Sequence, residues 1–157
     1  MNEKENNKIE HLWSVLCETA LIDNETNNIS LLNIVEQLSI SSVPQVAPVS
    51  KEGTTEISTI PIKFEIVSFF QRRGVNTSNL EVDATLTFLD PKNKIIKDGQ
   101  FKILFPKGMK RLRFRTKMNG LPVTTPGEYR FLLKIKEGKD FHEISSLPVD
   151  IKIEAKI

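Results

Sequence analysis

The stretch that decides the fold runs from residue 107 to residue 130 and reads KGMKRLRFRTKMNGLPVTTPGEYR. From 111 to 118 basic residues alternate with Leu, Phe, Thr and Met. A period of two places successive side chains on opposite faces of a β-strand, so this pattern predicts one solvated face and one buried face. Pro126 and Gly127 then interrupt the chain before a second alternating run begins at Tyr129.

The same alternation recurs along most of the chain after residue 57. The side chains expected to face a core are Ile60, Ile62, Phe64, Ile66, Leu80, Val82, Ala84, Leu86, Phe88, Phe101, Ile103, Phe105, Tyr129, Phe131, Leu133, Ile135, Leu147, Val149, Ile151 and Ile153. About eight strands with one wet face each predict an all-β fold, a single antiparallel β-sandwich that is immunoglobulin-like in general shape. A closed barrel is the alternative. Residues 9–157 are expected to form this one domain, and residues 1–8 a disordered N-terminus.

Residues 9–40 are compatible with two interpretations. The apolar positions before and after the Asp/Asn-rich segment 23–28 fit helical spacing as well as strand spacing. Two runs joined by a short turn suit a strand hairpin, which agrees with the later strands and is preferred here over two helices.

Residues 41–57 form the longest irregular stretch. Phe69 and Phe70 must point to opposite faces of a strand, so one of them needs cover, for which the 41–57 loop is a candidate, or else forms an exposed patch.

Three phrases carry a family resemblance: LCETALIDNETNNISLLNIVEQLSI at 16–40, PIKFEIVSFFQRR at 61–73 and RLRFRTKMNGLPVTTPGEYRFLLKI at 111–135. In this order they resemble an uncharacterised family of small bacterial β-sandwich proteins that end in a Gly-Leu-Pro and Pro-Gly-x-Tyr-Arg-Phe signature. The resemblance supports the hairpin before residue 41 and implies an intracellular bacterial protein. It implies no catalytic residue.

Composition narrows the function classes. The 157 residues include 22 basic and 20 acidic side chains, a net charge of +2, which does not favour general polyanion binding. The lone cysteine, Cys17, fits a reducing compartment. The polar N-terminus lacks the features of a signal peptide, and no apolar run approaches the roughly 20 residues of a membrane span. We therefore expect a cytoplasmic protein that does not enter the membrane.

The basic strand is the first candidate binding site. Its face would consist of Lys110, Arg111, Arg113, Arg115 and Lys117. Alternate side chains lie about 7 Å apart along a strand, a spacing that could follow the phosphates of a nucleic acid. The apolar alternates are needed for the core, however, so no aromatic side chain is free to stack on bases. The structural alternative is a solvated or edge strand whose cations pair with acids such as Glu81, Asp83 or Glu128.

Other chemistry has little support in the sequence. His11 and His142 are the only histidines, and they lack the partners and spacing of a zinc site. Cys17 is expected to be a buried small residue rather than a nucleophile. Tyr129 after Pro-Gly is expected to bond the backbone, as tyrosine corners do. No catalytic residue, metal ligand or cofactor site is assigned.

The sequence thus favours a non-enzymatic interaction or accessory module that binds another protein, or a second copy of itself, through strand edges or the basic face. Nucleic-acid or polyanion binding through residues 107–117 is the alternative. A hydrolase with an unrecognised site is the third hypothesis.

Overall fold

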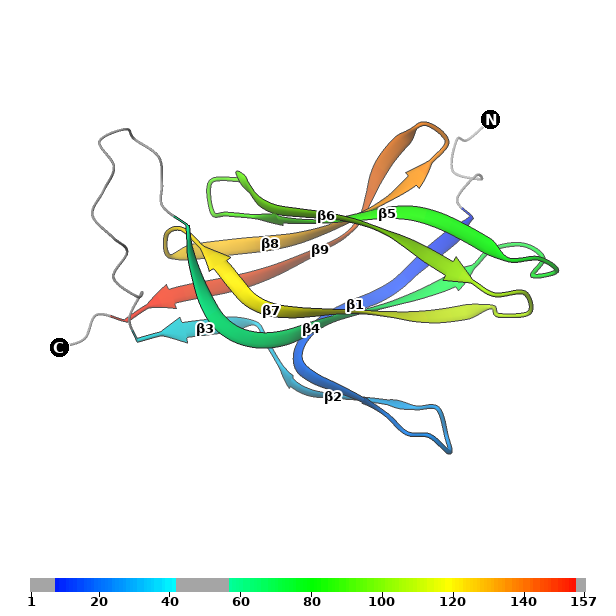
Figure 1. Cartoon of the computed structure of the whole chain (residues 1–157), viewed down its shortest axis with the longest axis horizontal. Coiled ribbons are helices and arrows are strands. Elements are labelled where there is room, and N and C mark those ends of the chain that lie inside the picture. The colour runs from blue at the N-terminus through cyan, green and yellow to red at the C-terminus, as the bar shows by residue number, and fades with distance from the viewer. Residues whose placement is uncertain (1–7, 42–56, 155–157) are drawn as a thin grey trace.

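Two β-sheets pack face to face in the computed structural model, which describes residues 8–41 and 57–154 (Figure 1). The described residues form β1 (Ile9–Ile22), β2 (Ile29–Ile34), β3 (Gln37–Ile40), β4 (Ser58–Arg72), β5 (Leu80–Leu89), β6 (Ile95–Phe105), β7 (Arg111–Val123), β8 (Gly127–Glu137) and β9 (Asp140–Ile153). One sheet has the order β2-β1-β4-β7 and the other the order β3-β9-β8-β5-β6. This confirms the predicted all-β sandwich.

The strands pair antiparallel except β3 and β9, which are parallel. The hairpin interpretation of residues 9–40 is confirmed, because 9–22 and 29–34 are paired strands. The described residues contain nine strands rather than about eight, because the chain after residue 28 forms two strands that belong to different sheets. β2 ends at Ile34, and β3 begins three residues later against the edge of the opposite sheet.

The predicted inward faces form the core. Phe88, Tyr129 and Phe131 stack at its centre, with ring centroids 5.3 Å apart for Phe88–Tyr129 and 4.3 Å for Phe88–Phe131. A second cluster includes Phe70, Phe105 and the inward residues of the first half of β7. Close packing of these side chains removes their apolar surface from water, which is the main force that holds the two sheets together.

Phe69 and Phe70 do point to opposite faces. Phe70 is fully buried between the sheets, whereas Phe69 faces outward against the ring of Trp13, at a centroid distance of 5.4 Å. Cover for Phe69 therefore comes from β1. The candidate cover at 41–57 lies almost wholly outside the described residues, as does the predicted disordered N-terminus up to residue 7. None of the described residues forms a helix with the length and hydropathy needed to cross a membrane.

Tyr129 forms the expected corner. Its hydroxyl donates to the carbonyl oxygen of Thr125 at 2.6 Å and accepts the backbone N–H groups of Thr124 and Thr125 at 2.8 and 3.1 Å. The ring is fully buried. One side chain therefore satisfies three backbone groups in the turn between β7 and β8, and fixes the point where the chain passes from one sheet to the other.

Replacing Tyr129 by Phe should keep the ring packing and remove only these hydrogen bonds. We expect a loss of about 1–3 kcal/mol in the free energy of unfolding, because the turn N–H groups lose a partner in a partly buried site. Urea denaturation of the wild type and the variant measures this difference. Equal stability would contradict the structural role of the hydroxyl.

Candidate functional site: the basic strand, the outer hairpin and the inter-sheet cavity

The basic strand is β7, at one end of the four-stranded sheet. Among the described strands its backbone pairs only with β4. Leu112 and Phe114 pack inward on the second core cluster, so the alternation read from the sequence is confirmed and the arginines face outward. The polyanion site was predicted on this outward face. Another element of the same chain covers part of it.

That element is the outer hairpin, defined here as residues 18–34. β1 pairs with β4 as far as the pair Cys17–Glu65, and beyond it β1 pairs with β2 alone. The hairpin lies on the outside of the four-stranded sheet, below β4 and β7 in Figure 1. Its inner side packs Ala20 and Leu31 near Val67 of β4, which is fully buried although it faces away from the main core.

Glu65 and Arg115 hold the hairpin where β1 separates from β4. The backbone N–H of Ala20 donates to Glu65 Oε2 at 2.6 Å, and its carbonyl oxygen accepts from Arg115 Nη2 at 2.8 Å. The same Arg115 nitrogen lies 2.8 Å from Glu65 Oε1. The Glu65 side chain is 8% exposed and that of Arg115 28%, so this charge-assisted group is largely shielded from solvent. It supplies the partners that Ala20 loses when its strand leaves the sheet.

A second arginine holds the tip of the hairpin. Arg113 Nη2 donates to both the backbone oxygen and the side-chain oxygen of Asn27, each at 2.7 Å. Asn27 has a φ of 57°, and the turn before it is held by Asp23, whose carboxylate accepts the N–H groups of Glu25 and Thr26. These hydrogen bonds lower the pKa of Asp23, and the bonds from Thr26 contribute most to this shift.

The other cations of the predicted face have lesser roles. Arg111 donates to the Gln71 side chain at 3.0 Å, within the sheet. Lys117 lies 3.9 Å from Glu65 and is largely exposed. Lys110 is exposed in the loop before β7, and its backbone oxygen accepts from Arg72. The five predicted residues therefore do not act as one ladder, because two of them bind the outer hairpin.

The prediction of which acids pair with the basic strand was wrong. Glu81 and Asp83 bind Lys102 of β6 instead, and Glu128 belongs to β8. β5 and β8 belong to the opposite sheet, so their outward side chains point away from β7. The true partner, Glu65, was missed. In the sequence, Glu65 lies two residues from Val67, an apolar residue on the same outward face of β4, and such a pair could indicate that this face is covered. The strand order that brings Glu65 and Val67 beside β7 cannot be inferred from the sequence.

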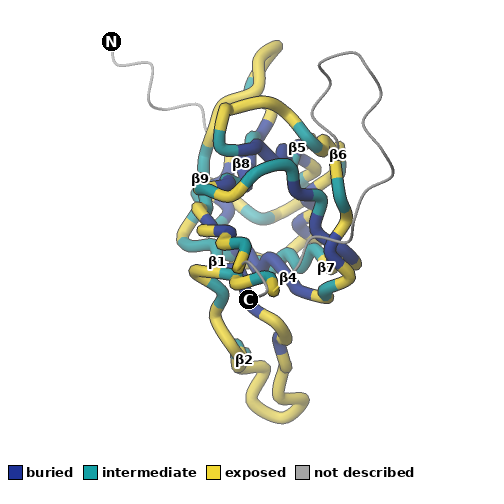
Figure 2. The backbone as a smooth tube through the Cα atoms, turned by 90° about the vertical axis from the view of Figure 1, so that its left-hand side faces the viewer, coloured by how far each residue is buried: buried dark blue, intermediate teal, exposed yellow. Residues whose placement is uncertain are grey.

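The outer surface of the hairpin is apolar. Leu21 pairs across the hairpin with Ser30, and Leu32 with Thr19, so these side chains lie on the side opposite Ala20 and Leu31. Figure 2 shows the hairpin exposed over most of its length. Its exposed large apolar residues are Leu21, Ile22, Leu32 and Ile34. This surface was not predicted, because the alternation in residues 9–40 does not show which side of the hairpin stays exposed.

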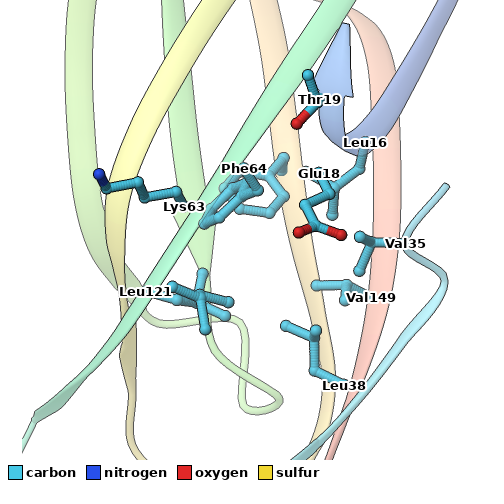
Figure 3. A pocket seen from close by; sticks show the side chains of 11 residues that line it. Leu16, Glu18, Thr19, Val35, Leu38, Lys63, Phe64, Leu121 and Val149 are labelled. Atoms are coloured by element: carbon cyan, nitrogen blue, oxygen red, sulfur yellow. The ribbon is translucent and has the colours of Figure 1, made fainter. Parts of the chain in front are cut away.

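A cavity of about 420 Å³ lies at the base of the hairpin, between the two sheets. Both sheets contribute apolar walls, including Phe64 and Leu121 from one and Phe131 and Val149 from the other. Figure 3 shows Phe64, Leu121 and Val149 around this space. The segment that leads from β2 to β3 also lines it. No sequence pattern indicates this cavity, since its wall residues have the same alternation as the rest of the core.

The two histidines and the cysteine considered above have structural positions in the fold. His11 bonds the Ser14 hydroxyl at 2.7 Å, which lies 2.7 Å from that of Ser68, and burial lowers the pKa of His11. Cys17 is fully buried, and burial followed by the charge of Glu65 raises the pKa of its thiol. His142 is exposed on the opposite sheet. Within residues 8–41 and 57–154 no three His, Cys, Asp or Glu side chains converge on a metal position.

Comparison with known proteins adds little to this geometry. No protein-family model and no curated protein matches the chain. Among solved structures 45 chains match, including one described as a β-glucuronidase from glycoside hydrolase family 2, with 13% identity and a TM-score of 0.40. The match covers 66% of this chain and 12% of that chain. So low a similarity carries no argument about function, and the resemblance to a bacterial β-sandwich family stays a prediction.

The contact of Arg115 with Glu65 should dominate the stability of the basic strand. Arg115→Met leaves the Glu65 carboxylate buried without its main cation, and we expect a loss of about 3 kcal/mol in the free energy of unfolding. Arg111→Met is the matched control, with an expected change within about 0.5 kcal/mol because Arg111 is exposed.

Adding Glu65→Gln to Arg115→Met should cost less than the sum of the two single changes, with a coupling of about 1–3 kcal/mol. Chemical denaturation of all four proteins measures both quantities. The account is wrong if Arg115→Met is no more destabilising than Arg111→Met, or if the two changes are additive.

Proposed function

We propose that this protein is a non-enzymatic interaction module that binds an extended segment of another protein at the outer hairpin. The observation that carries the proposal is the combination of exposed apolar side chains with an open strand edge. Ile34 is 58% exposed and Leu32 46% exposed, both on β2. In the described part of the chain β2 is hydrogen-bonded only to β1, so its other edge offers unpaired backbone groups.

Strand addition uses these two features together. Main-chain hydrogen bonds to an open edge supply affinity, and alternate side chains supply specificity. An incoming strand beside β2 would cover Leu32 and Ile34 with its own apolar side chains. Exposed apolar surface of this kind is typical of binding sites in soluble domains.

The charge of this region indicates the chemistry of the partner. From residue 9 to residue 50 the sequence contains no lysine and no arginine, whereas Glu18, Asp23, Glu25 and Glu36 lie within or directly after the outer hairpin. A partner strand in which apolar residues alternate with basic ones would complement both the apolar surface and the acidic side chains. The hairpin is therefore proposed to bind a basic, amphipathic segment.

Polyanion binding by the basic strand is the weaker alternative. Arg113 and Arg115 donate hydrogen bonds to the hairpin, so a nucleic acid would have to compete with contacts inside the chain. The lone, buried Cys17 and the family resemblance support a setting in the bacterial cytoplasm, which is part of this proposal.

Affinity capture from the native lysate with matched variants tests this function. The hairpin variant is Leu32→Glu with Ile34→Glu. The control is Leu104→Glu with Ile95→Glu, at positions that are 49% and 59% exposed on the opposite sheet. We expect the wild type and the control to recover the same protein, and the hairpin variant to lose it. A synthetic peptide from the recovered protein that binds should be basic and amphipathic.

Recovery that is equal for the hairpin variant, or no specific recovery by the wild type, would overturn the proposal. A captured nucleic acid that is released by Lys110→Glu with Lys117→Glu, and not by the hairpin variant, would favour the alternative. A homodimer in sedimentation that only the hairpin variant dissociates would replace the partner by a second copy of the chain.

A further inference from the structure

The cavity at the base of the outer hairpin has the size and lining of a ligand site. Its volume of about 420 Å³ falls within the range of roughly 300–1,000 Å³ for small-molecule sites. Figure 3 shows the side chains of both sheets and of the β2–β3 segment arranged around one space.

The cavity walls consist largely of side chains that are packed in the core and therefore have fixed positions. Phe64, Leu121, Phe131 and Val149 are all buried members of the main core cluster. Beside them the pairing of β4 with β7 shifts between Ile60 and Lys63, and this irregularity places Ile62 in the cavity wall. The apolar walls are therefore preformed, which reduces the entropy lost when a ligand binds.

The polar side chains at the cavity decide the charge of the ligand. Glu18 Oε2 accepts a hydrogen bond from Asn33 Nδ2 at 2.6 Å, and Figure 3 shows the Glu18 carboxylate turned toward the cavity. The Lys63 side chain extends away from it in the same view. No salt bridge within the described residues involves Glu18. A carboxylate that is oriented by a neutral amide and lacks a cationic partner favours a cationic ligand.

We propose that this cavity binds a small organic amine whose apolar body lies between the sheets and whose protonated nitrogen reaches Glu18. The apolar body buries surface against Phe64 and Phe131, and the ammonium group forms a charge-assisted hydrogen bond at the cavity mouth. This site lies at the base of the surface proposed above to bind a protein segment and shares Glu18 with it, but binding of the amine requires no partner protein.

Calorimetric titration of the purified full chain with three matched probes tests the proposal: decylamine and decanoate below their micelle concentrations, and decanol below its solubility limit. Decylamine should bind saturably at one site, more tightly than decanol, and decanoate should bind weakest. Glu18→Gln keeps the hydrogen bond with Asn33 possible and removes the charge. It should weaken decylamine about tenfold, which corresponds to about 1.4 kcal/mol, and leave decanol unchanged.

Filling the cavity provides an independent arm. Leu38→Trp extends a half-buried wall residue into the space and should abolish binding of all three probes. Leu104→Trp adds the same side chain at an exposed position of β6, which does not line the cavity, and should leave binding unchanged. Val35→Phe is a second filling variant, and circular dichroism checks the fold of each.

Four results would overturn the proposal. Three concern the charge of the ligand: no saturable decylamine binding, tighter binding of decanoate than of decylamine, or equal decylamine affinity in Glu18→Gln. The fourth is unchanged binding in both filling variants, because the ligand would then lie elsewhere. These titrations use no partner protein, so their failure is distinguishable from failure of the capture experiment.

Discussion

The structure outside the main core depends on one group of charge-assisted hydrogen bonds, in which Glu65 and Arg115 bind the two backbone groups of Ala20. A strand that leaves its sheet must find new partners for its N–H and C=O groups. Here β4 supplies the acceptor and β7 the donor, and each neutralises the other. The outer hairpin can therefore lie against the outside of the sheet. Both proposed binding sites follow from this position, one on the hairpin and one at its base.

The strand order changes the role that we assign to the charged residues of the basic strand. In the sequence, alternating arginines suggest a ladder for phosphates. In the fold, Arg113 binds Asn27 at the hairpin tip and Arg115 binds Ala20 where the hairpin begins. Their hydrogen bonds hold the outer hairpin against the sheet, and the hairpin is the surface that we propose binds a partner.

Much of the fold was predictable because a strand period of two is a local property. The inward faces of β4 to β9 and the hydroxyl contacts of Tyr129 followed from alternation and from the Pro-Gly turn. The separation of β2 from β3, the partner of Arg115 and the cavity were not predictable. Each depends on which strands become neighbours, and contacts such as Arg115–Glu65, 50 residues apart, leave no local pattern.

Hydrogen exchange of individual backbone amides tests the central claim most directly. In the wild type, the Ala20 amide and the paired amides of β1 and β2 should be protected. In Arg115→Met the hairpin amides should exchange at least about tenfold faster and should be far less protected than the amides of β5 and β8, which lose protection only as far as the free energy of global unfolding falls, because the hairpin opens without unfolding the sandwich. Arg111→Met should behave as the wild type. Unchanged protection of the hairpin in Arg115→Met would contradict the account.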